Sequence, residues 1–199
     1  MRLPGPRPAA LRGPLSPARA PRSSAALGAR VTVAPRPGYA AVARSGPALP
    51  WEGSRLTFSA GRCVPPDNEQ SSVRMATGTR LQAAAVPEKS IARLRGEIEP
   101  KLAAQEYQDQ LDLLATKCGE QVYRHDLILL GLGEDGHTAS LFPGTKALEE
   151  KRPSGVANFI PKLSTWRLTC TFPLINQART LWFLMNANKQ QDLFERVLA

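Results

Sequence analysis

Two short stretches in the first third of the chain have the residue pattern of β-strands. Residues 30–34 (RVTVA) are a β-branched run, and residues 55–59 (RLTFS) alternate apolar and polar side chains. Such patterns are typical of strands. The following loop, residues 62–67 (RCVPPD), contains two prolines, which cannot donate hydrogen bonds to a neighbouring strand. The pattern therefore predicts that the second strand ends in a rigid loop.

Two later apolar runs lack this alternation. Residues 126–130 (DLILL) form a continuous apolar run that is followed by glycine, and residues 180–185 (TLWFLM) form a second run. Continuous runs of this length are typical of strands that are buried on both faces of a parallel sheet. We therefore expect both runs to lie inside such a sheet.

A helical repeat separates the two groups of strands. Pro100 is well suited to the first position of a helix, and Gly119 lies where that helix would end. Between them, one apolar stripe recurs at intervals of four, four and three residues: Ala103, Tyr107, Leu111 and Leu114. Residues 192–198 predict a further short helix. Strands that alternate with helices predict an α/β fold around a parallel sheet.

The size and composition of the chain fit one such domain. It has 199 residues, of which 42% are hydrophobic and 22% charged, and no apolar run approaches the roughly 18 to 20 residues of a bilayer-spanning helix. We therefore expect a soluble protein with no membrane partner. Cys63, Cys118 and Cys170 lie far apart, which favours neither a disulfide framework nor a structural zinc site. A reducing compartment, the cytoplasm, is the expected location.

The net charge of +9 is concentrated at the amino-terminal end. Residues 1–50 hold eight arginines, ten prolines and no lysine or acidic residue, whereas the rest of the chain has 18 basic and 17 acidic side chains. Low apolar content together with frequent proline predicts disorder over residues 1–29. The folded α/β domain is then expected to span residues 30–199.

Three interpretations of this basic segment stay open. An organelle transit peptide would be rich in arginine and poor in acidic residues, but the prolines would break its amphipathic helix. A nucleic-acid-binding arm would be basic, but no aromatic residue precedes Tyr39 to stack on a base. A solvated extension, or a start codon placed too early, is the interpretation that we favour. We therefore expect no nucleic-acid partner.

The chemistry of the chain is densest directly after the first buried strand, in residues 131–144 (GLGEDGHTASLFPG). Gly131, Gly133 and Gly136 fit the GxGxxG pattern of dinucleotide sites. However, the proline and glycine at the end of the segment would stop the long helix that such a site requires, and two acidic residues would face the pyrophosphate. A metal site is also disfavoured, because one histidine and two adjacent acidic residues have no second ligating cluster.

The segment places one imidazole, His137, after the end of a predicted strand, where α/β folds usually bind ligands. A neutral histidine accepts a proton near pH 7, and Asp135 would fix its tautomer if the chain doubles back. The plainer alternative is that His137 caps a short helix. The other histidine, His125, is predicted to lie on the surface beside Arg124 and Asp126.

Residues 127–144 (LILLGLGEDGHTASLFPG) resemble the signature of the 6-phosphogluconolactonase family. Further blocks agree in the order of that family: LPWE (49–52), RCVPPD (62–67), SSVRMA (71–76), WRLTCTFPLINQAR (166–179) and the last strand with Lys189 behind it. The resemblance covers roughly residues 30–199. It implies a Rossmann-like α/β fold, a parallel-sheet sandwich shared with sugar-phosphate isomerases and deaminases.

The resemblance also implies a reaction and a set of residues. The family hydrolyses 6-phospho-D-glucono-1,5-lactone to 6-phospho-D-gluconate in the pentose phosphate pathway, with neither a metal nor an organic cofactor. His137 would be the base that activates water, with Asp135 beside it and the amides of residues 133–137 facing the oxyanion. Substrate-binding residues would be Arg62, Gly133, Gly136, Thr138, Arg167 and Lys189, with Arg179 a weaker candidate for the phosphate.

The chain also departs from the family pattern. Family members carry a Ser-Gly-Gly-Ser-Thr-Pro phosphate loop after the first strand, but this chain reads VTVAPRPGY at residues 31–39. An Asp-Glu-Arg sequence is replaced by Ala60-Gly61-Arg62, the usual Asn-Tyr by Ser72-Val73, and the pattern looks truncated at both ends.

Two hypotheses from different classes follow from these departures. One is a working lactonase with an altered phosphate-binding site. The other is an inactive remnant of the family that at most binds sugar phosphates. A deaminase of the same superfamily fits less well, because residues 140–143 (SLFP) lack its extra carboxylate. The sequence leaves the oligomeric state open.

Overall fold

The computed structural model describes residues 30–33, 54–76 and 87–184, the first range by its backbone alone. Within them, five parallel strands form one sheet in the order β4-β2-β1-β5-β8. These strands are β1 (Arg30–Val33), β2 (Arg55–Thr57), β4 (Ile91–Ala92), β5 (Leu127–Gly131) and β8 (Leu181–Leu184). The predicted α/β fold with a parallel sheet is confirmed.

The apolar run at residues 126–130 forms β5, which lies between β1 and β8 in the sheet. Ile128 and Leu130 are fully buried, and Leu129 nearly so. This burial on both faces is what the continuous apolar run predicted. The residues that follow β5 therefore start at the carboxyl end of a strand that lies inside the sheet.

The second apolar run forms β8, but it is not buried as predicted. Trp182 is 57% exposed and Phe183 is 44% exposed, so side chains on both faces of this strand reach the surface. Among the described residues β8 pairs only with β5 and is therefore an edge strand. Apolar composition alone does not distinguish such an edge strand from a central one.

A second sheet, of three antiparallel strands in the order β3-β7-β6, was not predicted. It contains β3 (Ala60–Arg62), β6 (Gly155–Ile160) and β7 (Thr165–Cys170). The chain leaves the parallel sheet after β2 and enters this second sheet at Ala60, so the strand predicted over residues 55–59 ends two residues early. A short 3-10 helix, η5 (Pro161–Leu163), connects β6 to β7.

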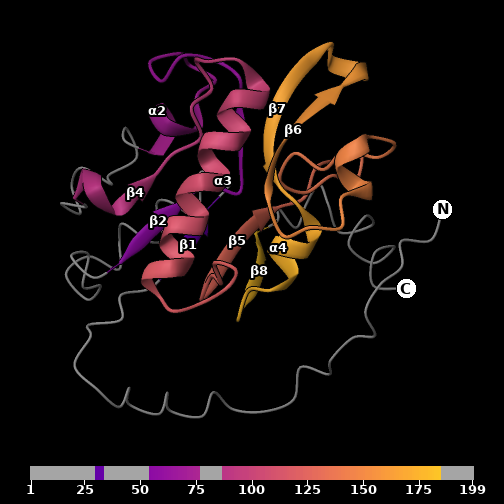
Figure 1. Ribbon diagram of the computed structural model, residues 1–199. Coiled ribbons are helices and arrows are strands. Elements are labelled where there is room, and N and C mark those ends of the chain that lie inside the picture. The colour runs from indigo at the N-terminus through magenta and orange to yellow at the C-terminus, as the bar shows by residue number, and fades with distance from the viewer. Residues whose placement is uncertain (1–29, 34–53, 77–86, 185–199) are drawn as a thin grey trace.

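The predicted helix is α3 (Pro100–Lys117), whose first turn is capped by the Glu99 side chain accepting a hydrogen bond from the Leu102 amide at 2.8 Å. The helix lies against β6 and β7, as Figure 1 shows in the centre of the molecule. The buried residues of its apolar stripe are Ala103, Tyr107 and Leu111. Tyr107 from this stripe is fully buried, and its hydroxyl donates to the Phe58 carbonyl at 2.8 Å. The helix therefore ties the antiparallel sheet to the chain between β2 and β3.

The remaining described elements are short. They are the helices α2 (Ser72–Ala76) and α4 (Phe172–Asn176) and the 3-10 helices η3 (Glu88–Ser90) and η4 (Lys146–Glu149). In the part of the chain that the structure describes, no helix combines the length and the apolar character needed to cross a bilayer. The predicted disordered segment 1–29, the LPWE block, Lys189 and the helix predicted at 192–198 lie outside the described residues.

His125 does not lie on the surface, so that prediction is wrong. Its side chain is fully buried, with Nε2 2.9 Å from the Thr57 hydroxyl and the ring edge-on to Tyr123. The prediction rested on the charged neighbours of His125 in the sequence. The residue is buried because this segment leads directly into the buried strand β5. His125 therefore belongs to the core.

Candidate active site

A cleft of about 590 Å³ lies beside the loop that leaves the carboxyl end of β5. Four of the predicted site residues line it: Arg62, Asp135, His137 and Arg167. Eight further lining residues carry side chains that were not among the predicted site residues: Ala60, Ser72, Glu134, Ala139, Ser140, Phe142, Lys162 and Leu163. The cleft is therefore built from the β5 loop, β3, β7 and η5, segments far apart in the sequence.

Asp135 and His137 form a close pair inside the cleft. His137 Nδ1 lies 2.5 Å from Asp135 Oδ1, and the same oxygen accepts from the His137 amide at 3.3 Å. An ionised carboxylate can only accept, so the imidazole carries its proton on Nδ1 and leaves Nε2 as the basic nitrogen. The chain doubles back as the sequence reasoning required.

The imidazole is held in place by its neighbours. The Phe142 ring stacks on it with a centroid separation of 3.9 Å and an interplanar angle of 15°. A Cβ at Gly133 would lie 2.2 Å from both Cε1 and Nδ1 of His137, so the backbone of Gly133 is also close to the ring. Glycine is therefore required at this position by the histidine itself, which is a different reason from the dinucleotide pattern.

The hydrogen bonds of the loop keep most of the predicted donors occupied. The Gly133 amide donates to the His137 carbonyl at 2.7 Å, and the Gly136 amide donates to the Gly133 carbonyl at 2.9 Å. Gly136 has a φ of 82°, a left-handed conformation that favours glycine. Gly133 and Gly136 thus shape the loop, and neither lines the cleft.

Thr138, predicted to bind substrate, is also turned to the loop. It is 8% exposed, and its hydroxyl donates to the Gly131 carbonyl at 2.8 Å. This bond closes the loop onto the end of β5. Thr138 does not line the cleft.

A second wall of the cleft, formed by β3 and β7, carries two arginines. Arg62 on β3 and Arg167 on β7 are directly paired across the antiparallel ladder. Like charges at such a position repel, unless an anion lies between them. Arg62 is held by its guanidinium donating to the Gln70 carbonyl at 3.0 Å, whereas Arg167 Nε is buried and has no hydrogen-bond partner among the described residues.

These charges and the burial change two pKa values in the cleft. Burial, and then the nearby Arg62 charge, lower the pKa of Arg167. Burial, and then the Arg167 charge, lower the pKa of His137 from its ordinary value of 6.5. His137 is therefore neutral at pH 7, which is the state of a proton acceptor.

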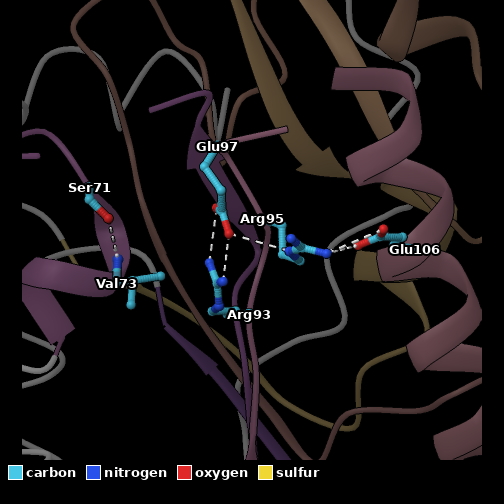
Figure 2. A network of polar contacts seen from close by, with 6 residues as sticks. All are labelled: Ser71, Val73, Arg93, Arg95, Glu97 and Glu106. Atoms are coloured by element: carbon cyan, nitrogen blue, oxygen red, sulfur yellow. Dashed lines mark hydrogen bonds and ion pairs between the residues drawn. The ribbon is translucent and has the colours of Figure 1, made fainter. Parts of the chain in front are cut away.

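The turn formed by residues 93–97 supports Arg62 from behind. Arg93 binds Glu97 through two hydrogen bonds of 3.0 and 2.6 Å, and Arg95 links Glu97 to Glu106 on α3, as Figure 2 shows. A Cβ at Gly96 would lie 2.2 Å from the Arg62 carbonyl oxygen. The backbone of Gly96 is therefore in close contact with the backbone of Arg62.

Of the two other candidates for phosphate binding, only Arg179 lies within the described residues, and it does not line the cleft. Arg179 forms an ion pair of 3.0 Å with Asp126, which precedes β5 and so lies at the opposite end of that strand. Lys189 lies outside the described residues. Within those residues there is also no cluster of three or more His, Cys, Asp or Glu side chains suited to a metal ion.

The fold and the site define an α/β protein with a histidine–aspartate pair at the carboxyl end of a parallel strand. Comparison with known proteins places it more closely. The family described as "Glucosamine-6-phosphate isomerases/6-phosphogluconolactonase" matches residues 33–199. The chain belongs to this family.

Individual relatives agree with this assignment. The chain is 42% identical over 164 residues to a 6-phosphogluconolactonase of Synechocystis sp., covering 81% of this chain and 66% of the relative. It is 32% identical over 174 residues to the human 6-phosphogluconolactonase, covering 86% and 66%. The chain thus spans less than two thirds of the length of these relatives.

Solved structures show the same fold. The 6-phosphogluconolactonase from Trypanosoma brucei superposes with a TM-score of 0.71 at 25% identity, covering 86% of this chain and 74% of that one. The enzyme from Thermotoga maritima superposes with a TM-score of 0.73 at 21% identity, covering 86% and 76%. The predicted Rossmann-like α/β architecture is therefore confirmed.

Proposed function

We propose that this chain hydrolyses 6-phospho-D-glucono-1,5-lactone to 6-phospho-D-gluconate, with His137 as the general base. The observation that carries the proposal is the His137–Asp135 pair, held in a cleft that two arginines also line. The family and the names of the relatives supply the substrate class. The pair supplies a base, and the arginines supply positive charge for a phosphate.

In this mechanism, Nε2 of His137 takes a proton from water while the water oxygen bonds to the lactone carbonyl carbon. The carbonyl oxygen becomes an oxyanion. When that intermediate collapses, the bond from the carbonyl carbon to the ring oxygen breaks, and the ring oxygen takes the proton back from the imidazolium. A lactone carbonyl is already electrophilic, so the mechanism requires neither a metal nor an organic cofactor.

The oxyanion would be stabilised by donors of the β5 loop. In the loop from Gly133 to His137, the amides of Glu134 and Asp135 are those for which the described residues provide no hydrogen-bond acceptor. They are the candidates for this role. The amides of Gly133, Gly136 and His137 would act by holding the loop in shape.

The phosphate would bind between Arg62 and Arg167. Each guanidinium can donate two parallel hydrogen bonds to phosphate oxygens. Both arginines line the cleft, so their guanidinium groups are the candidates for these contacts. Lys189 remains a proposed further contact.

A second candidate function is a remnant that binds sugar phosphates without hydrolysing the lactone. The observation that favours it is Ala60, which lines the cleft where the family sequence has an aspartate. An alanine methyl group can neither accept nor donate a hydrogen bond. The two candidates therefore differ in turnover and agree in phosphate binding.

Lactone hydrolysis by the purified chain, with the spontaneous rate subtracted at pH 7, tests the proposal. We expect activity above background that falls by about 10²- to 10⁴-fold in a His137→Ala variant, because a general base contributes that much. An Arg152→Ala variant is the matched control, since that side chain is 85% exposed and does not line the cleft.

The outcomes separate the two candidates. Background rates in a folded parent chain, with inorganic phosphate still raising its melting temperature, would establish the remnant. Equal rates above background in the parent and the His137→Ala chain would instead remove His137 from the mechanism.

We propose the cytoplasm as the location of this activity, with an organelle reached through the basic amino-terminal segment as the alternative. All three cysteines are free: Cys63 is half-buried, Cys118 exposed and Cys170 buried. Free thiols fit a reducing compartment. Fluorescence microscopy of the chain with and without residues 1–29 distinguishes the two locations.

A further inference from the structure

Lys162 reaches the candidate active site from a segment that the site prediction left out. It lies in η5, and its Nζ pairs with Oδ2 of Asp135. The other oxygen of that carboxylate, Oδ1, holds His137 Nδ1 at 2.5 Å. Asp135 is thus bound on both oxygens, by an ammonium group on one side and an imidazole on the other.

The same lysine also contacts the ring that supports the histidine. Nζ of Lys162 lies 5.1 Å from the centroid of the Phe142 ring, a distance at which a cation is attracted to an aromatic face. Phe142 in turn stacks on His137. Lys162, Asp135, His137 and Phe142 therefore form one contiguous cluster in the cleft.

We propose that Lys162 is a positioning residue for the active-site base, which acts by holding Asp135 against His137. The catalytic part of this proposal rests on the proposed function, but the positioning part does not. With Oδ2 fixed by the ammonium group, the carboxylate cannot rotate away from Nδ1, and the imidazole keeps the tautomer with a free Nε2.

The ammonium group also balances the charge of Asp135. The charged groups that line the cleft with His137 are Asp135 and Glu134 on its own loop, Arg62 on β3, Lys162 on η5 and Arg167 on β7. Loss of the Lys162 charge leaves the Asp135 carboxylate uncompensated. A carboxylate that faces an imidazole favours the protonated ring, so the pKa of His137 is expected to rise.

An ordinary surface ion pair would not have this effect. The Lys162 side chain is 54% exposed, and exposed pairs typically contribute little to stability. If Lys162 formed only such a surface ion pair, its removal would change neither the pKa of His137 nor the rate constant kcat. This difference makes the proposal testable.

The test is an NMR titration of the imidazole Cε1 protons in the parent chain and in a Lys162→Met variant. The chain has only two histidines, and His125 is fully buried in the core, so a His137→Gln chain assigns the two signals. We expect the pKa of His137 to rise by about 0.5 to 1 unit in Lys162→Met. Lys162→Arg should restore it, because arginine keeps the charge.

A Lys151→Met variant is the matched control, since Lys151 is exposed and does not line the cleft. Its His137 titration should equal that of the parent. An unchanged His137 titration in Lys162→Met would overturn the proposal, as would a shift of the same size in Lys151→Met. If Lys162→Met does not fold, Lys162→Gln makes the same test.

The NMR measurement does not depend on turnover, so it separates this proposal from the proposed function. A shifted titration in a chain without lactonase activity would support the positioning role and remove the catalytic one. In an active chain, we expect Lys162→Met to lower kcat by about 10-fold with KM nearly unchanged. A rise in KM alone, with the titration unmoved, would identify Lys162 as a substrate contact and refute the positioning role.

Discussion

The two walls of the cleft are built in different ways. The wall with His137 is made mostly by contacts between near neighbours in one loop: Asp135 at Nδ1, the Gly133 backbone close to the ring, and the Phe142 ring stacked on it. The wall with Arg62 and Arg167 joins two strands that are far apart in the chain and are paired across the antiparallel sheet. The base is therefore positioned mostly by contacts within its own loop, whereas the two arginines are brought together by tertiary structure.

This difference explains which wall depends on distant residues. Most of the contacts that shape the histidine loop come from its own residues, and Lys162 on η5 adds one contact from outside the loop. The arginine wall depends on the turn at residues 93–97, whose ion pairs connect it to α3 and whose Gly96 touches the Arg62 backbone. Substitutions in the loop should therefore affect the rate constant, and substitutions behind the arginines should affect substrate binding.

The largest effect is expected from Gly133→Ala. The added methyl group would lie 2.2 Å from the imidazole and must displace it, and displacement of a reacting group by about 1 Å can cost about 10²-fold in rate. Measured kcat should fall by about that factor. Gly119→Ala is the control for lost stability without a steric clash at the site. Gly119 has a φ of 68°, which disfavours alanine, but a Cβ there meets nothing within 4 Å and the residue does not line the cleft, so kcat should stay at the parent value. Retention of the parent rate by Gly133→Ala would show that the loop adapts.

A smaller effect, on binding, is expected from Arg167→Met. Methionine keeps much of the buried chain of the arginine but removes a phosphate donor, so KM should rise about 10-fold while kcat changes little. Inhibition by inorganic phosphate should weaken in parallel. A fall in kcat at unchanged KM would contradict the division of roles between the two walls.

The smallest effect is expected from the ion pairs behind the arginine wall. Arg93, through its side-chain hydrogen bonds, is the main cause that lowers the pKa of Glu97 from 4.5 to about 2. A carboxylate with a lowered pKa stabilises the fold above pH 4.5, and this contribution is lost as the pH falls from 4.5 to 2. Because the pair is partly exposed, we expect about 1 kcal/mol.

A Glu97→Gln variant measures this contribution. Its free energy of unfolding in urea should be about 1 kcal/mol lower than that of the parent at pH 7, and the difference should shrink as the pH approaches 2. Glu149→Gln, at an exposed position in η4, serves as the control. A difference that is the same at pH 7 and pH 3 would exclude the Glu97 charge as its source.

The sequence by itself determined the elements whose signals are local. The continuous apolar run of β5 predicted a buried strand, and the periodic apolar stripe of α3 predicted a helix. Both predictions worked because the pattern of apolar residues along a segment depends on which of its faces are buried. The spacing of Asp135 and His137 predicted the close pair, because two residues so near each other meet through one tight turn. The same local reasoning failed for His125 and for β8, whose burial is set by their place in the sheet.

Only the tertiary structure decided which cationic side chains share the cleft with His137. The antiparallel sheet pairs Arg62 with Arg167, and η5 brings Lys162 to Asp135. Such contacts join segments that have no common period or motif. They are specified by the packing of the whole chain, which no short stretch of sequence contains.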